Sequence, residues 1–405
     1  MLGREDRPDD VLEFGRDRRP RGRWRSRALL AGLVLAASLV AAIRTGVWSS
    51  SSSRAHHARP AASGLATPSV AVPRIRVIAT GRHLLGVTAG WELLARGLDD
   101  LVRIQLAKGQ ITWTSVPLLA SGGAVAFMAT AHEALIRPSD YVPGYVVPDN
   151  RQARLLTGPL ASGGPLIPGV QGTETFWGST ETQTTRELSL VTLDGRRVGP
   201  IIRFPAHGPQ LPATAASDGR GDVLVASSGS SFYDAGPTWD RPVPGTIIAV
   251  GPASWLTVIC DARSEHCHNE LVDSTDDSGR ALPGTSRAEP FFFTWPPAGV
   301  ISPDGAMAAV AGRVVVGESG GQLNAVHLID LRTGATKDLR VRAAGTTGSP
   351  LGTATGEDSM AWSPDSRWLF VATASGKLLA VNPRSGLVKS LGIKLPQVQQ
   401  VAIRR

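Results

Sequence analysis

Two cysteines and two histidines lie close together in the segment C-D-A-R-S-E-H-C-H, which runs from Cys260 to His268. In an exported protein, an even and closely spaced cysteine pair favours a disulfide bond between Cys260 and Cys267. Two free thiols are one alternative, and a metal site that includes His266 and His268 is another. Because neighbouring side chains on a strand point to opposite faces, these four groups do not all reach one ion. The disulfide is the favoured interpretation, and the sequence predicts no metal ion and no cofactor.

Adjacent carboxylates occur at Asp99-Asp100, Asp276-Asp277 and Glu357-Asp358. Glycoside hydrolysis requires two carboxylates that converge from opposite sides of a cleft, and adjacency alone does not supply that geometry. Each pair lies beside an expected turn, where Asp accepts hydrogen bonds from the backbone. A role in turns is therefore favoured over catalysis, and the chain also contains neither a P-loop nor an H-E-x-x-H motif.

Aromatic residues offer a second kind of candidate site, because the chain contains ten Trp residues. Trp239 and Trp295 lie among Pro and Gly residues, so they are predicted to be exposed contacts for a partner, together with Phe292. The stretch F-F-F-T-W-P-P that contains the last two is interpreted either as a buried strand or as a partner-binding patch. Trp362 and Trp368 lie in strand-like surroundings and are expected in the core.

The elements that would position such residues are clearest from Ser359 to Gly386. The segment S-P-D-S at 363–366 has turn chemistry, an apolar run follows from Trp368 to Thr373, and further turns separate two more short strands. The segment S-P-D-G at 302–305 repeats the opening turn. These repeated turns and strands resemble the WD-repeat-like and TolB-like β-propeller families. The resemblance implies an all-β propeller and, as is usual in those families, a protein-binding role without catalytic residues.

The pattern of short strands extends over residues 73–405. One candidate blade holds strands at His83–Val87, Trp91–Ala95, Leu101–Leu106 and Gln110–Val116. Later units are predicted at about 124–157 and 166–204, from 213, and from 246, 299 and 359. Within the unit that begins near residue 213, the segment from Ser227 to Pro244 is expected to be a long exposed loop. The sequence thus predicts seven four-stranded blades. Spread over residues 73–405, the length of each blade is close to the roughly 40–50 residues typical of such repeats.

Ring closure is a further expectation. The last blade is complete by Leu391, yet the chain continues with strand-like residues. The segment Val398–Ile403 is therefore predicted to complete the first blade, beside His83–Val87, and to remove an exposed strand edge.

The residues before the strands are of another kind. Residues 1–27 form a basic tail, and a charge-free apolar run from Ala28 to Ile43 follows. This run reaches about 24 Å as a helix, and flanking Arg27, Arg44 and Trp48 extend it toward the roughly 30 Å of a bilayer core. Residues 28–48 are predicted to be a transmembrane anchor, with a cleaved signal peptide as the alternative. Residues 49–72 are a Ser/Ala/Pro linker that is expected to be flexible.

Charge argues against a nucleic-acid partner. Residues 1–72 contain 12 Arg and 6 acidic residues, so they account for most of the net charge of +8. A nucleic-acid module concentrates basic charge on its folded face, whereas this excess lies in the tail and linker. The positive tail is expected to stay in the cytoplasm and the strands outside the plasma membrane.

Two functions follow as hypotheses. The first is a membrane-tethered, extracellular propeller without enzymatic activity, which binds a protein or a polymer of the cell envelope. The second is an exported lyase or glycoside hydrolase whose site lies in the centre of the propeller. A centre with two facing carboxylates and a His would favour the enzyme, and small or apolar residues there would favour the binding module.

Overall fold

The structure is a computed structural model, and it divides the chain into two compact units, Met1–Ser69 and Val70–Arg405. It describes residues 75–116, 125–138, 144–157, 166–169, 174–181, 185–205, 215–226, 232–235, 240–260, 266–283, 299–316, 321–344 and 359–404. The predicted tail (1–27), anchor (28–48) and linker (49–72) lie outside these residues. Among the described residues, no helix has the length and apolarity needed to cross a membrane.

The described residues form strands and contain no α-helix, and the strands make six sheets. The first sheet contains β1 (Ile75–Ala79), β4 (Gln110–Ser115), β3 (Asp100–Gln105), β2 (Glu92–Arg96) and β29 (Gln400–Arg404), in that order. Three sheets follow in the chain: β5 (Val125–Ala129), β6 (Glu133–Pro138), β7 (Tyr145–Pro148) and β8 (Arg154–Leu155); β9 (Leu166–Pro168), β10 (Thr175–Glu181), β11 (Thr185–Thr192) and β12 (Arg197–Pro205); β13 (Ala215–Ser217), β14 (Val223–Ala226), β15 (Phe232–Ala235) and β16 (Asp240–Val243).

The next sheet has eight strands, β17 (Thr246–Val250), β18 (Ser254–Cys260), β19 (Cys267–Asp273), β20 (Gly279–Ala281), β21 (Gly299–Ile301), β22 (Met307–Val316), β23 (Gly321–Asp330) and β24 (Thr336–Arg342). Its two antiparallel halves meet where β17 and β21 run parallel, at the single pair Val250 and Val300. The last sheet contains β25 (Met360–Trp362), β26 (Leu369–Ala372), β27 (Leu378–Asn382) and β28 (Leu387–Ser390). The predicted starts at 246, 299 and 359 agree with the first residues of β17, β21 and β25 to within one position.

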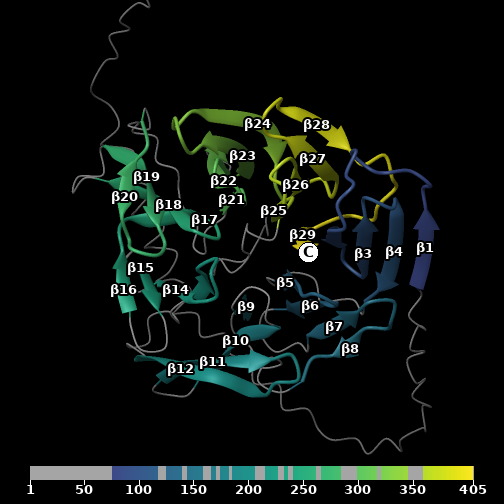
Figure 1. Cartoon of the computed structure of the whole chain (residues 1–405), viewed down its shortest axis with the longest axis horizontal. Coiled ribbons are helices and arrows are strands. Elements are labelled where there is room, and N and C mark those ends of the chain that lie inside the picture. Colours follow the sequence, from purple (N-terminus) through teal and green to yellow (C-terminus); the bar gives the residue numbers. More distant parts are fainter. Residues whose placement is uncertain are drawn as a thin grey trace, which may run out of the picture. The chain divides into compact units, whose positions relative to one another are not determined.

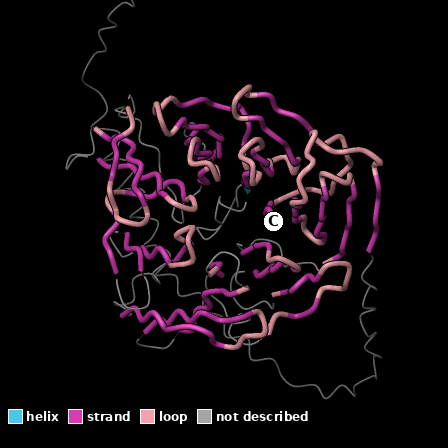
Figure 2. The backbone as a smooth tube through the Cα atoms, in the orientation of Figure 1, coloured by secondary structure: helices cyan, strands magenta, loops and turns pink. Residues whose placement is uncertain are grey.

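Within the unit Val70–Arg405 the sheets are arranged around a centre, as in a β-propeller (Figures 1 and 2). The strands nearest the centre are one edge strand of each smaller sheet and the two middle strands, β17 and β21, of the eight-stranded sheet. Several of these strands contact one another: β29 contacts β25 and β5, β21 contacts β17 and β25, and β9 contacts β13. The outer edges are formed by β1, β8, β12, β16, β20, β24 and β28. This arrangement agrees with the propeller-like, all-β fold expected from the repeated turns.

The apolar core lies between neighbouring sheets. Leu94 of β2 packs with Phe127 and Val147 of the next sheet, and Trp91 packs with Phe370 of the last sheet. Four other clusters join the remaining neighbouring sheets in the same way. A fifth lies between the two halves of the eight-stranded sheet, so that the contacts return to the first sheet. Because neighbouring sheets cover both faces, strands such as β2, β18 and β26 are buried on both sides, whereas the outer strands β1, β24 and β28 are largely exposed.

Tryptophan indoles connect neighbouring sheets through hydrogen bonds. Trp177 of β10 donates to the carbonyl of Gly221 at 2.6 Å, and Trp255 of β18 donates to the carbonyl of Asp218 at 2.9 Å. Trp362 of β25 donates to the carbonyl of Val300 at 3.0 Å. Trp362 and Trp368 are both buried, which confirms their predicted place in the core. An indole suits this position because its ring fills apolar space while its N–H reaches a polar partner.

The S-P-D turns form as expected. The amide of Ser366 donates to the carbonyl of Ser363, and that of Gly305 donates to the carbonyl of Ser302, both at 2.8 Å. Ser366 has a φ of 56°, the left-handed region that glycine adopts most easily. Its hydroxyl accepts a hydrogen bond from the amide of Asp304 at 3.0 Å, so this turn also joins two neighbouring sheets.

Ring closure is confirmed, but the predicted partner strand is wrong. β29 pairs antiparallel with β2, from Glu92 opposite Arg404 to Arg96 opposite Gln400. The segment His83–Val87 is not a strand, because Leu85 and Gly86 both have positive φ values, which turn the chain. A strand absent from the sequence prediction, β1, pairs instead with β4 at the outer edge of this sheet.

The predicted long loop between Ser227 and Pro244 is also wrong in part. β15 and β16 lie within it and pair in register from Phe232 opposite Val243 to Ala235 opposite Asp240. The Pro and Gly content misled the prediction. Pro242 occupies an edge strand, where proline is tolerated because the missing N–H is not needed by a neighbour.

Candidate functional site

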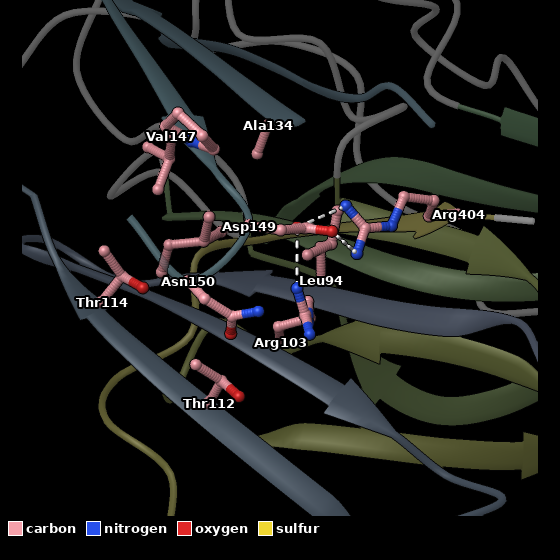
Figure 3. A pocket seen from close by; sticks show the side chains of 11 residues that line it. Leu94, Arg103, Thr112, Thr114, Ala134, Val147, Asp149, Asn150 and Arg404 are labelled. Atoms are coloured by element: carbon pink, nitrogen blue, oxygen red, sulfur yellow. Dashed lines mark hydrogen bonds and ion pairs between the residues drawn. The ribbon is translucent and has the colours of Figure 1, made fainter. Parts of the chain in front are cut away.

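Four charged side chains meet between the first sheet and the second. Glu92 and Arg404 lie opposite each other on β2 and β29, and Arg103 lies on β3 beside them. Asp149 follows β7 of the second sheet and reaches both guanidinium groups (Figure 3). The pleat places Glu92, Arg103 and Arg404 on one face because each strand alternates its side chains between faces.

The distances describe a compact ion cluster. Asp149 Oδ1 lies 2.8 Å from Nη1 of Arg103 and 2.8 Å from Nη1 of Arg404. Asp149 Oδ2 accepts a second hydrogen bond from Nη2 of Arg404 at 3.1 Å, so Arg404 binds this carboxylate in a bidentate manner. Arg404 Nη2 also donates to Glu92, whose Oε2 lies 3.5 Å from Nε of Arg103. Gln105 donates to the other oxygen of Glu92.

The electrostatics of the cluster are balanced, with two guanidinium groups and two carboxylates. The side chain of Arg404 is 6% exposed and that of Asp149 is 33% exposed. Burial of Arg404 favours its neutral form, but hydrogen bonds and attraction from Asp149 and Glu92 outweigh that effect and raise the pKa of Arg404. Both arginines are therefore held by carboxylates, which leaves neither guanidinium free to bind an anionic ligand.

A pocket adjoins the cluster. It is lined by Leu94, Leu101, Arg103, Thr112, Thr114, Ala134, Val147, Pro148, Asp149, Asn150 and Arg404 (Figure 3). The space inside it that the centre of a water molecule can occupy is about 10 Å³. This is close to the smallest space that holds one water molecule. The pocket therefore has room for about one water molecule. The ion pairs of the cluster join β29, β2 and β3 to the loop after β7.

The strands nearest the centre have a different composition. β5, β9, β13, β17, β21 and β25 contain small, apolar or hydroxyl-bearing residues, and among the described residues of these strands there is no Asp, Glu or His. β29 adds only Arg404 as an ionisable group. General acid–base chemistry requires titratable groups within reach of the reacting atoms, and the inner strands described here supply none besides this paired arginine.

The disulfide predicted from the cysteine spacing is confirmed. Cys260 ends β18 and Cys267 begins β19, directly opposite, with their Cα atoms 4.0 Å apart. The bond uses both sulfur atoms, so neither cysteine is a metal ligand here. Nε2 of His268 lies 3.7 Å from Oε2 of Glu270 on the same strand. Among the described residues, no group of three His, Cys, Asp or Glu side chains is placed to hold a metal ion.

The structure describes only some of the other residues that the sequence analysis singled out. Trp239, Trp295 and Phe292 lie outside the described residues, as does the pair Glu357-Asp358. Asp276 accepts a hydrogen bond from the amide of Ser278 at 2.9 Å, which confirms its role in a turn. The structure brings none of the described carboxylate pairs together with a second pair across a cleft.

One further sequence pattern also concerns catalysis. Residues 317–321 read G-E-S-G-G, which matches the G-x-S-x-G pattern of many serine hydrolases. That pattern requires a sharp turn from a strand into a helix. Here it connects β22 and β23, which pair as an antiparallel hairpin, and residues 317–320 lie outside the described residues. The surrounding fold therefore does not provide the context of a nucleophile elbow.

The ion cluster itself was not predicted. Its members are far apart in the sequence, and Glu92 and Arg404 are separated by 312 positions. The available signal was a charge within an otherwise apolar strand, as in E-L-L-A-R, L-V-R-I and V-A-I-R. Such a charge requires a partner when both faces of the sheet are covered.

Comparisons with known proteins concern the fold. No protein-family model matches the chain, and no curated protein does. Among solved structures, TolB from Acinetobacter baumannii matches 79% of this chain and 68% of its own length, with 15% identity and a TM-score of 0.40. A putative 6-phosphogluconolactonase from Bacteroides fragilis matches 79% and 99% of the two chains, with 12% identity and a TM-score of 0.44. An oligogalacturonate lyase in complex with manganese matches 77% and 92%, with 11% identity and a TM-score of 0.46.

Proposed function

We propose that this chain is a membrane-tethered β-propeller of seven blades that binds a protein or a cell-envelope polymer outside the plasma membrane. The blade count treats the eight-stranded sheet as two blades, since its halves share one parallel pair. The first blade takes β2, β3 and β4 from one part of the chain and β29 from another, with β1 as an added outer strand. The apolar clusters between successive sheets support this count.

The observation that carries the binding role is the composition of the inner strands. Small and apolar residues at the centre are the outcome that favours a binding module over an exported lyase or hydrolase. The charged cluster lies between two sheets and has its charges matched within it, so it supports a structural part for those residues. A scaffold with rigid blades presents its loops for recognition, since loops tolerate the variation that binding requires.

The tether follows from the sequence of residues 28–48 and the basic tail before it. A periplasmic phosphatase fused after Arg405 should be active, and a fluorescent protein that folds only in the cytoplasm should stay dark. The reverse result would place the propeller in the cytoplasm and would remove the proposed site of action, although the fold would stand.

Binding is tested with the full chain in its membrane. We would cross-link intact cells, purify the chain through a tag, and identify bound proteins; isolated cell-wall material would be tested in a pelleting assay. The control is the chain without residues 396–405, which keeps the proposed anchor but loses β29. Partners that depend on an intact β29 support the proposal. Identical partners for both chains, or none for either, would contradict it, and release of soluble sugar fragments would support the enzyme instead.

A further inference from the structure

β1 is an apolar edge strand that is open on one side. It pairs with β4 along one edge, and no described strand pairs with its other edge. Val77 is 54% exposed and Ile75 is 38% exposed, although both are large apolar residues. An edge strand presents unpaired N–H and C=O groups, and these are a template for another strand.

Five of the six other outer strands carry a feature that discourages strand addition. β8 and β20 are very short, β12 and β16 contain Pro200 and Pro242, and β24 has an irregular register and many charges. The sixth, β28, has four residues and one charge, Lys389, which lies 5.9 Å from the centre of the Trp368 ring. β1 contains no proline, and all five of its residues pair with β4 in one continuous register. Its single charge, Arg76, lies 5.6 Å from the centre of the Trp113 ring. β1 therefore lacks the usual protection of an edge.

We propose that two copies of this chain pair antiparallel through the outer edges of their β1 strands. A two-fold axis at Val77 places the two Val77 residues opposite each other and Ile75 opposite Ala79 of the second copy. The pleat puts these residues on one face, so apolar side chains meet apolar side chains. On the other face, Arg76 lies opposite Ile78 of the second copy. No like charges oppose each other, and the same patch serves both copies, as a two-fold interface requires.

The geometry explains why a second copy fits this edge. Self-pairing succeeds only when the sequence of the strand is complementary to its own reverse, and a charge at position 77 or equal charges at 76 and 78 would prevent it. The contact involves only five residues of each copy, so the area that it buries is far below the roughly 1,200 Å² of a stable interface. The dimer is therefore expected to be weak in dilute solution. The two Ile75 residues would lie about 13 Å apart along the strands. The proposed tether would confine both copies to one surface and favour the pair by effective concentration.

Cysteine cross-linking tests the arrangement in the full chain. The only two natural cysteines form a disulfide with each other, so an introduced cysteine is the single free thiol. Two differently tagged copies are expressed together, membranes are oxidised briefly, and products are separated without reducing agent. We expect Val77→Cys to cross-link to itself, and Ile75→Cys to cross-link to Ala79→Cys but much less to itself. The control is Leu387→Cys on the outer strand β28, where the natural residue is 48% exposed.

The expected difference is about tenfold or more in initial rate between Val77→Cys and Leu387→Cys, because pairing raises the local concentration of the two thiols. Adding Val77→Lys to the 75/79 cysteine pair should lower its cross-linking to the rate of the control, since two lysines would then face each other. Val77→Thr keeps a β-branched residue and should retain most of the cross-linking. Melting temperatures of these variants should match the natural chain because residue 77 is exposed.

Three results would overturn the proposal. Cross-linking at Leu387→Cys as fast as at Val77→Cys would indicate random collision. Equal rates for the 75/75 and 75/79 combinations would contradict the antiparallel register. A dimer that survives Val77→Lys would use another surface. None of these results would bear on whether the centre of the propeller or its loops bind a partner.

Discussion

The sheet β25–β28 and the closing sheet (β1–β4 with β29) are held together by different kinds of contact. In the former, Ser363 donates to Asp365 at 2.5 Å and accepts from the amide of Trp368 at 2.9 Å, so neighbours in sequence organise the turn. In the closing sheet, Arg96 bonds Gln399, 303 positions away, and Arg404 bonds Glu92, 312 positions away. Local contacts shape each blade, whereas long-range contacts decide whether the ring holds. The two regions should thus respond differently to substitution.

The largest effect should come from deleting Pro396 to Arg405. The deletion removes five paired residues of β29 and the buried side chains of Val398 and Val401. At about 1 kcal/mol net for each backbone hydrogen bond and roughly 1.5–3 kcal/mol for each buried valine, the unfolding free energy should fall by more than about 5 kcal/mol. Thermal melting followed by circular dichroism measures the change.

A synthetic peptide of residues 396–405 provides the control for this deletion. If β29 acts by completing the first sheet, the added peptide should bind the truncated chain and raise its melting temperature with increasing concentration. A truncated chain that melts like the natural one would show that the ring does not depend on β29. Deleting a frayed tail, by contrast, would leave the melting temperature nearly unchanged.

Arg404→Met should have the next largest effect. It leaves Glu92 and Asp149 with one guanidinium between them at a site where the Arg404 side chain is 6% exposed. Removing one partner of a buried ion pair costs about 3–5 kcal/mol. The matched control is Arg154→Met, which breaks a 3.2 Å pair with Glu133 where the arginine is 52% exposed. That change should cost less than about 1 kcal/mol. Equal losses in urea denaturation would contradict a special role for the cluster.

Ser363→Ala tests the local turn between β25 and β26. Ser363 is fully buried, and its loss leaves the amide of Trp368 and the carboxylate of Asp365 without this partner. The unfolding free energy should fall by about 1–3 kcal/mol. Ser385→Ala is the control, since the Ser385 hydroxyl is exposed and accepts a long 3.3 Å hydrogen bond from Leu387. It should stay within about 0.5 kcal/mol of the natural chain.

The same contrast explains what the sequence could predict. The turns S-P-D-G and S-P-D-S, the strands after them and the cysteine pair depend on nearby residues, and all were predicted correctly. The ion cluster depends on which strand meets β29, and no local pattern determines that pairing. His83–Val87 looked like a strand because of its apolar residues, yet the backbone turns at Leu85. β1 was missed because it follows a linker-like segment and leaves its apolar side chains exposed.

The smallest effect concerns pH, and it should have opposite signs at Asp304, in the S-P-D-G turn between β21 and β22, and at Asp100 of the closing sheet. Burial raises the pKa of Asp304, but hydrogen bonds from Ser302, from the amide of Ala306 and from Ser366 outweigh it, and the net result is a lowered pKa. A lowered folded-state pKa stabilises the protein above the unfolded pKa, and this contribution is lost as pH falls through the folded pKa. Asp304→Asn should therefore destabilise the chain at pH 7, by under about 1 kcal/mol after solvent screening. The difference should shrink as pH falls through the lowered folded-state pKa of Asp304.

Asp100 of the closing sheet provides the opposite case. Burial first, and repulsion from Asp99 second, raise its pKa, so ionisation of Asp100 in the folded chain costs stability once pH rises above the unfolded pKa. Asp100→Asn should thus stabilise the chain at pH 7 and have no effect in acid. Urea denaturation of both variants and of the natural chain between pH 3 and pH 7 shows how the unfolding free energy of each changes with pH. If the two substitutions shift stability in the same direction at pH 7, then either the buried environment of Asp100 or the hydrogen bonds to Asp304 do not hold in solution.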